Sequence, residues 1–508
     1  MTGFNRIFPF AAGIQRQQVQ AGALSGMREQ LYELQRQITT GQKAKTYGEL
    51  GSDRVTSLFV RNQLGVTQGY QQVVDLTTIR LKMMDQSTSE LNSIASTART
   101  TLLKSRGTNN DADMATAKQQ VQSAFDQMIS TLNRQVAGLY LYSGRTRDVK
   151  PVLDSTTIIN GDGVNAGLRQ VVDERRQADF GTGNGRMVTS VTGSTVAWGE
   201  DAVGNPFGIK LVPGSVSGTL SSAAITGPAV APNTLSVNFT GQPTSGERMT
   251  VTVKLPDGTT KTLGFAADKA SSADDSVFAI GATPADTANN LKAAIDNKLA
   301  SLAGGELREA SSLMATREFF SGSRTNPPPR VAGPPFASSI GYAAAGTRPT
   351  VIWYQGDDDA SIAARDTQKA EVDTATSVSF GARASEGAFR DTLAAFATVL
   401  VEDYPVGLVS SRERFDAAAG RAMNLLNSSG GPDAILGVNA EFGTTMGQIK
   451  SVSEVHKNAT LFLNGLIDGV ESANKESLAL QLTALQTQLE AAYQTTATLS
   501  KLSLTNYI

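Results

Sequence analysis

Hydrophobic residues recur at alternating spacings of three and four near the start of the chain. This spacing places them on one stripe of an amphipathic helix, with a seam like that of a coiled coil. The residues of the stripe are Leu24, Met27, Leu31, Leu34 and Ile38. We expect the helix to end before Gly41, because glycine readily adopts the left-handed conformation that closes a helix.

Two further helices are predicted before residue 150. Asp53 is expected to cap a helix that runs without proline to about Arg106. About 50 residues at about 1.5 Å each give roughly 75 Å, far above the ordinary helix length. A third helix follows the polar segment GTNNDAD and is expected to end at Gly138. Residues 1–150 are therefore predicted to be the N-terminal helical arm of a rod.

The end of the chain repeats this pattern. Helices are predicted over 386–401, 412–426 and about 433–467, followed by a last helix after Asp468 and Gly469. The seam of that last helix consists of Leu478, Leu482, Leu485, Leu489, Leu499 and Leu502. Residues 384–508 are thus predicted to be the C-terminal helical arm. The two terminal seams have little else in the chain to cover them, so we expect them to be a subunit interface that becomes ordered on assembly.

The pattern changes between residues 151 and 383. Glycine, threonine and proline become frequent, and alternating apolar and polar residues in 234–266 predict strands, with a turn at Pro256–Gly258. One helix is predicted over 284–303, and further strands near 349–359 and 376–382. The expected fold is α+β: both termini form a long antiparallel helical rod, and a β-rich domain of residues 151–383 is inserted between them.

Composition removes several classes of function. The 508 residues carry a net charge of −2, which gives no basic footprint for nucleic acid. Cysteine is absent and His456 is the one histidine, so disulfides, thiolate metal sites and most histidine-based catalysis are excluded. No run approaches about 18 apolar residues, so we expect no membrane insertion. The N-terminus lacks the features of a cleaved secretory signal.

Few positions suggest chemistry. Asp357, Asp358 and Asp359 form a carboxylate cluster, but the glycine and glutamate offsets of a calcium-binding EF-hand loop do not follow. The glycines at 181, 183 and 185 are better read as a flexible loop than as a phosphate cradle, because no long apolar strand precedes them. His456 lies in a predicted helix and is expected to be solvated or at an interface. No catalytic residue, metal ligand or cofactor site is predicted.

Several motifs resemble those of the flagellin superfamily of bacterial flagella. Residues 31–53 (LYELQRQITTGQKAKTYGELGSD) resemble the exit of the family's first helix, and residues 469–504 resemble its terminal helix. LYLYSGRTRDVKPV at 139–152 and WYQGDDD at 353–359 are similar to segments of hook–filament junction proteins (hook-associated protein 3). The chain departs from the family in keeping only Asp53 of an Asp pair and in having Asn474 where the family often has Asp.

The resemblance implies a structural role and no enzymatic activity. A hook–filament junction protein would join hook to filament by self-assembly of its terminal helices and would serve motility. Its partners would be itself, hook-associated proteins, flagellin, the type III flagellar export apparatus and a cytoplasmic export chaperone on 478–502. It would be extracellular, exported without a cleaved signal. A filament flagellin, a surface adhesin or binding module, and an enzyme are the alternatives that the sequence leaves open.

Overall fold

The structure is a computed structural model that describes residues 9–107, 110–228, 232–270, 272 and 274–505, with side chains from residue 18 to 498. It is a mixed α+β protein. Two compact units are present. Unit 1 consists of the described residues of 1–75, 371–376 and 449–508, and unit 2 of those of 76–370 and 377–448. The three-part division at residues 150 and 383 stays a prediction.

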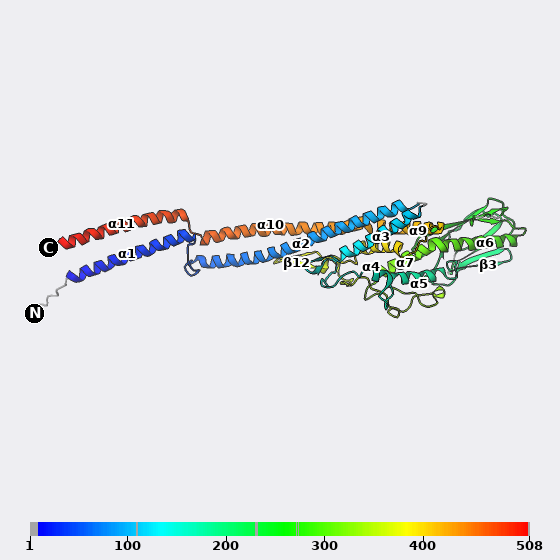
Figure 1. Ribbon diagram of the computed structural model, residues 1–508, viewed down its shortest axis with the longest axis horizontal. Helices are drawn as coiled ribbons and strands as arrows, with labels where there is room; N and C mark the ends of the chain where they lie inside the picture. Colours follow the sequence, from blue (N-terminus) through cyan, green and yellow to red (C-terminus); the bar gives the residue numbers. More distant parts are fainter. Residues whose placement is uncertain (1–8, 108–109, 229–231, 271, 273, 506–508) are drawn as a thin grey trace. The chain divides into compact units, whose positions relative to one another are not determined.

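Helices dominate both ends of the chain (Figure 1). The α-helices are α1 (Pro9–Thr40), α2 (Asp53–Ser105), α3 (Asp111–Leu132), α4 (Ser155–Asn160), α5 (Leu168–Phe180), α6 (Pro284–Leu302), α7 (Arg308–Ser321), α8 (Gly387–Leu400), α9 (Val409–Ser428), α10 (Gly431–Glu471) and α11 (Lys475–Thr505). Shorter helical turns are η1 (Ala303–Leu307), η2 (Phe336–Ser338) and η3 (Ala364–Thr367).

The strands are short. They are β1 (Gln135–Val136), β2 (Leu139–Tyr140), β3 (Met187–Thr192), β4 (Thr195–Glu200), β5 (Lys210–Leu211), β6 (Ser217–Gly218), β7 (Ala223–Thr226), β8 (Thr234–Phe239), β9 (Arg248–Lys254), β10 (Thr260–Asp268), β11 (Val277–Ala279), β12 (Lys369–Asp373) and β13 (Thr376–Ser379).

In unit 1, α1 and α11 run side by side in opposite directions (Figure 1). Near the end of α1, Gly41 accepts a backbone hydrogen bond from Ala473, while further along Arg28 Nε donates to the hydroxyl of Tyr493 at 2.8 Å. Gly41 has φ +72°, which confirms that it closes the first helix. The pairing of α1 with α11 brings the first and the last helix of the chain together within this unit.

The remainder of unit 1 includes the first part of α2, the last part of α10 and residues 371–376. Gln71 donates to Ser453 at 3.0 Å, and the rings of Tyr70 and His456 stack with centroids 6.0 Å apart. The side chains of α2 that are buried here recur at helical spacing, as a packed seam requires. They are Ser57, Val60, Thr67 and Val74.

The core of the β region in unit 2 lies between two sheets and a helix. One sheet has the strand order β3-β4-β8-β7, and the other has β11-β10-β9-β5, with β6 also paired to β9. The predicted hairpin is confirmed, since β9 and β10 pair antiparallel from Lys254↔Thr260 onward. Helix α6 packs its buried face, which includes Leu291 and Ile295, into the same core.

Three α-helices of residues 151–383 were not predicted: α4, α5 and α7. Helices α5 and α7 bury charged and hydroxyl side chains, so their apolar stripes are too short to show a clear helical period. Arg175 on α5 is one example, because it is almost fully buried and pairs with Asp179. Residues 151–383 therefore contain more helix than the single segment expected at 284–303.

Two other local predictions were wrong. The third helix ends at Leu132 and not at Gly138, because Ala137 and Gly138 take positive φ and form the turn between β1 and β2. Residues 349–359 form isolated bridges and not a strand. Trp353 is fully buried there and donates its ring N–H to the backbone carbonyl of Phe320 at 2.8 Å.

Threonines along α11 share one conformation. The hydroxyl of each donates to the backbone carbonyl four residues earlier, at distances of 2.7 to 3.0 Å. This bonding is the usual way in which a helix accommodates a threonine hydroxyl. The residues are Thr483, Thr487, Thr495, Thr496 and Thr498.

Candidate functional site

The predicted interface residues of α1 all lie on the seam that faces α11. Each of them is partly buried: Leu24, Met27, Leu31, Leu34 and Ile38. The two terminal helices therefore cover part of each other's seam, which reduces the apolar surface that remains for other molecules.

On α11 the seam is more deeply covered. Leu478 and Leu485 are buried, and Leu482 and Leu489 are partly buried. The side chains of Leu499 and Leu502 lie outside the described residues. Contact of these seams with a second molecule stays a prediction.

A groove of about 640 Å³ lies between α1 and α11. Leu34 and Leu485 supply its apolar part, while Glu29 and Glu33 supply charge from α1 and glutamines line the side of α11. The seam of this helix pair is thus incompletely filled within unit 1.

The connection between α10 and α11 is fixed by Glu471. Its carboxylate accepts hydrogen bonds from Arg61 Nε at 2.8 Å and from the hydroxyl of Ser57, and its backbone carbonyl accepts the N–H of Lys43 at 2.8 Å. Hydrogen bonds from Arg61 and Ser57 outweigh burial and lower the pKa of Glu471. Asn474 then caps α11, because its side-chain oxygen accepts the backbone N–H groups of residues 476 and 477.

One exposed apolar surface of unit 1 was not predicted. On α2, a second face beside the buried seam carries Val55 (70% exposed) and Phe59 (67% exposed), followed by Val66 and Val73. Their spacings of four, seven and seven keep them on one face. The signal was present in the sequence, because Val55, Phe59, Val66 and Val73 recur at helical spacing on this helix.

Helix α10 carries exposed apolar residues in the same unit. Phe462 is 67% exposed and Leu461 is 70% exposed. Val455 and Leu466 add to them. Contiguous exposed apolar residues of this size on a folded chain usually mark a surface that contacts another molecule.

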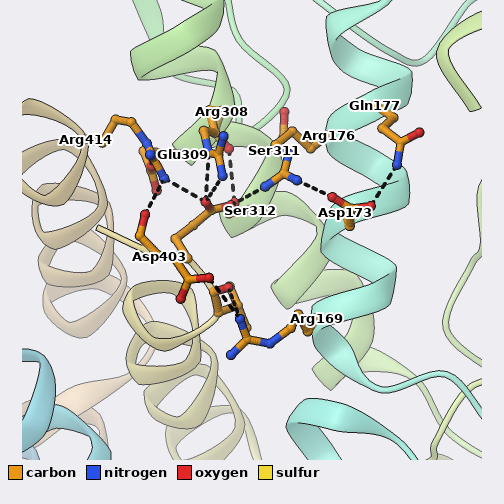
Figure 2. A network of polar contacts seen from close by, with 12 residues as sticks. Arg169, Asp173, Arg176, Gln177, Arg308, Glu309, Ser311, Ser312, Asp403 and Arg414 are labelled. Carbon is orange, nitrogen blue, oxygen red and sulfur yellow. Dashed lines mark hydrogen bonds and ion pairs between the residues drawn. The ribbon is translucent and has the colours of Figure 1, made fainter. Parts of the chain in front are cut away.

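Unit 2 holds a buried polar network that sequence reasoning also missed. Figure 2 shows arginines of three helices converging on it: Arg176 of α5, Arg308 of α7 and Arg414 of α9. All three donate to the carboxylate of Glu402, at 3.3, 2.8 and 2.9 Å, and the hydroxyl of Ser312 adds a bond of 2.7 Å. Because Glu402 is 1% exposed, one carboxylate just after α8 ties three helices together.

The same network contains a second buried carboxylate, Glu309, whose pKa is shifted in the opposite direction to that of Glu402. Burial raises the pKa of Glu402, but the Arg308 guanidinium and the bond from Ser312 outweigh it and hold that pKa below its usual range. Burial and the nearby Glu402 charge raise the pKa of Glu309 to about 8. Arg414 donates to Glu309 Oε1 at 3.1 Å, while Oε2 has no partner among the described residues.

A cavity of about 440 Å³ opens beside this network. Its lining includes Arg169, Arg176 and Arg308, balanced by Asp173, Glu402 and Asp403. The charges cancel and each arginine already faces a carboxylate (Figure 2). The arginines of this cavity therefore serve to hold the helices together.

The carboxylate cluster at 357–359 is used for ion pairs. Asp357 accepts from Arg145 at 2.9 Å and from Arg383 at 3.1 Å, and Asp359 also pairs with Arg145. Burial alone would raise the pKa of Asp357, but the hydrogen bond from Arg145 and the charge of Arg383 lower it to about 2. Among the described residues no group of acidic or histidine side chains has the geometry of a metal site.

His456 is buried and not solvated. Its Nε2 lies 2.7 Å from the backbone carbonyl oxygen of Val372, and its ring stacks on Tyr70. The apolar stripe of α10 gave no hint of this contact, because Val372 is distant in the sequence. The histidine is a packing residue of unit 1.

Over the residues that the structure describes, every helix is too short or too polar to cross a membrane. Comparison with known protein families found no match, and comparison with curated proteins found none either.

Proposed function

We propose that this protein is a structural, self-assembling component of the bacterial flagellum that joins hook to filament. The observation that carries the proposal is the exposed apolar surface of unit 1, above all Phe59 on α2 and Phe462 on α10. Large side chains with two-thirds of their surface in water are costly for an isolated molecule, and their burial by a neighbouring copy would recover about 1.5–3 kcal/mol each. The flagellin-like motifs in the sequence support the same function.

In this proposal the fold is a long helical rod of both termini that carries the β-rich region as an insert. Helices α1 and α11 are covered on one side only within the chain, so contact with neighbouring copies would complete their burial. Assembly would therefore couple association to ordering of the terminal helices, and no bond would be made or broken.

The proposed route of export is compatible with the incompletely covered seam of α11. A subunit that leaves the cell unfolded through the type III flagellar apparatus must be kept from premature assembly. A cytoplasmic chaperone on residues 478–502 would do so by covering the seam of α11. The protein would then act outside the cell, with hook-associated proteins and flagellin as neighbours.

Localisation tests the flagellar part of the proposal. A labelled copy at a single band between hook and filament is the expected result. Label along the whole filament would instead make the protein a filament flagellin. Label over the cell body, or binding of a ligand that is lost when residues 151–383 are removed, would contradict the proposal in favour of an adhesin.

Paired surface variants test self-assembly. We expect Phe59→Ser combined with Val66→Ser to weaken self-association of the purified protein at least tenfold, measured by sedimentation velocity. The control is Val188→Ser on β3, which is also exposed (57%) but lies in unit 2. Equal self-association of both variants and the parent would show that the exposed stripe of α2 is not an interface.

A further inference from the structure

The exposed face of α2 has the period of a helix-packing seam. Its positions are spaced by four and three residues in turn, the spacing at which one helix packs against another in a coiled coil. Every residue at these positions is uncharged and exposed, and we call the set the α2 seam. Its members are Val55, Phe59, Asn62, Val66, Gly69 and Val73.

Helix α10 carries a second seam of the same kind in unit 1. Packing of α2 on α10 within the chain uses other residues, among them Gln71 with Ser453 and Tyr70 with His456. On the exposed face of α10 the spacing of four and three recurs, and the residues are again uncharged and exposed. These residues, the α10 seam, are Ser451, Val455, Asn458, Phe462, Gly465 and Gly469.

The hydrogen bond from Gln71 to Ser453 shows which residues of the two helices lie level. Because α2 and α10 are antiparallel, equal steps in opposite directions from this pair keep residues level. Each level pair then joins a position of one seam to a position of the other. Since each seam repeats every seven residues, such a match occurs for about one relative position in seven. The pairs are Phe59 with Gly465, Asn62 with Phe462, Val66 with Asn458 and Gly69 with Val455.

The level pairs that contain a glycine also match in size. A Cβ atom added at Gly465 would meet nothing within 4 Å, so the surface of α10 is open there. Phe59, which is level with it, is 67% exposed. Gly69 is open in the same way and is level with Val455, which is 58% exposed. A large side chain on one helix can therefore fill the gap beside a glycine of the other, as close packing of helices requires.

We propose that the α2 seam of one copy of this chain packs against the α10 seam of a second copy, with the copies parallel and without axial shift. The inference rests on the proposed self-assembly and identifies the surfaces that make the contact. The occupant is a second copy because the two seams that match in level and size belong to the same chain. Each copy presents both seams, so the contact is heterologous and continues from copy to copy in a row or a closed ring.

Disulfide cross-linking tests the contact, because the chain has no cysteine of its own. Val66→Cys and Asn458→Cys, combined in one chain, place two thiols level across the proposed contact. Mild oxidation at a concentration at which the parent self-associates should then give covalent dimers and higher oligomers on a non-reducing gel. The matched control combines Val73→Cys with Asn458→Cys, which lie on the same seams but about 10 Å apart along the helix axis. Because a disulfide needs Cα atoms within about 7 Å, the control should cross-link about tenfold less.

Single variants distinguish this contact from other ways of pairing. Val66→Cys alone and Asn458→Cys alone should stay monomeric on the gel. Covalent dimers of Val66→Cys alone would mean that α2 packs on α2 of the second copy, and the inference would be overturned. Equal cross-linking of the level pair and of the control would overturn it too, because the copies would then have no fixed register.

A change of volume gives a readout that needs no oxidation. Gly465→Leu fills the gap that Phe59 would occupy, so it should weaken self-association at least about tenfold in sedimentation velocity. Its monomer should unfold at the same temperature as the parent or higher, because leucine favours a helix more than glycine does. Gly443→Leu is the control, since Gly443 is an exposed glycine of α10 outside the seam and its Cβ position is also open. Equal association of Gly465→Leu and the parent would overturn the contact.

Failure of this contact and failure of the proposed function give different results. If the parent does not self-associate, both the proposed self-assembly and this contact are wrong. If the parent self-associates but the chain with Val66→Cys and Asn458→Cys does not cross-link, the contact between the two seams alone is wrong.

Discussion

Units 1 and 2 differ in whether the following phenylalanine side chains are exposed or buried. In unit 1, Phe59 and Phe462 are each 67% exposed. In unit 2, Phe389 and Phe396 are fully buried, and even the carboxylate of Glu402 is 1% exposed. Unit 2 thus buries these two phenylalanines and pairs Glu402 within one chain, whereas unit 1 leaves Phe59 and Phe462 largely in water. Under the proposed function, we expect unit 1 to gain more stability from a partner than unit 2 does.

The largest effect is expected from removing the central carboxylate of unit 2. Glu402→Ala leaves the three guanidinium groups of the network without their shared acceptor, and loss of one partner of a buried ion pair costs about 3–5 kcal/mol. Urea unfolding followed by tryptophan fluorescence should show it, because Trp198 and Trp353 both lie in unit 2. Asp403→Ala is the control, since this side chain is 78% exposed, and it should cost less than about 1 kcal/mol.

The stability of unit 2 is expected to depend on pH through Glu309. With its pKa raised to about 8 from 4.5, Glu309 keeps its proton in the folded state while the unfolded chain loses it above about pH 5. The folded state then binds more protons, so stability should fall as the pH rises from about 5 to about 8. The slope for one proton is at most about 1.4 kcal/mol per pH unit.

Glu309→Gln removes the titrating group and should flatten that slope. The measurement is the urea midpoint of the parent and the variant at several pH values between 5 and 8. If both proteins show the same slope, Glu309 is ionised in the folded state and Arg414 compensates its burial.

In unit 1 the corresponding test is a truncation of the seam. Leu485 is 8% exposed, so Leu485→Ala should destabilise the pair of α1 and α11 by about 2 kcal/mol, the low end for a leucine in a small core. Faster hydrogen exchange in residues 18–40 would report it. The control is Leu480→Ala on the same helix, where the side chain is 76% exposed. If both variants exchange alike, the two helices do not pack through the predicted seam.

The smallest effect on stability is expected from the capping box at the start of α6 in unit 2. Thr283 accepts the N–H of Asp286, whose carboxylate accepts the backbone N–H of Thr283 in return. Thr283→Ala should lower the stability of unit 2 by about 1 kcal/mol, while Thr283→Ser should retain most of it. A urea midpoint of Thr283→Ala equal to that of the parent would show that the cap of α6 does not limit stability.

The sequence was informative where a single apolar period decides the structure. The long helices, the close of α1 at Gly41 and the hairpin of β9 and β10 followed from such periods. It was uninformative where polar groups are buried in pairs: α5 and the contacts of Glu402 depend on partners far away in the chain. The exposed stripe of α2 was missed for another reason, because two apolar stripes on one helix do not reveal which of them is covered.

The threonines of α11 affect how strongly the surface of that helix is hydrated. Each of the five hydroxyls turns back to its own backbone, so the hydroxyl's donor is already occupied and the methyl group stands beside it on the surface. Judged from its composition, the helix should be well hydrated. Because these hydroxyls donate to the helix backbone, fewer donors are left for water than the sequence suggests. A neighbouring molecule could therefore displace water from this surface at little cost in hydrogen bonds.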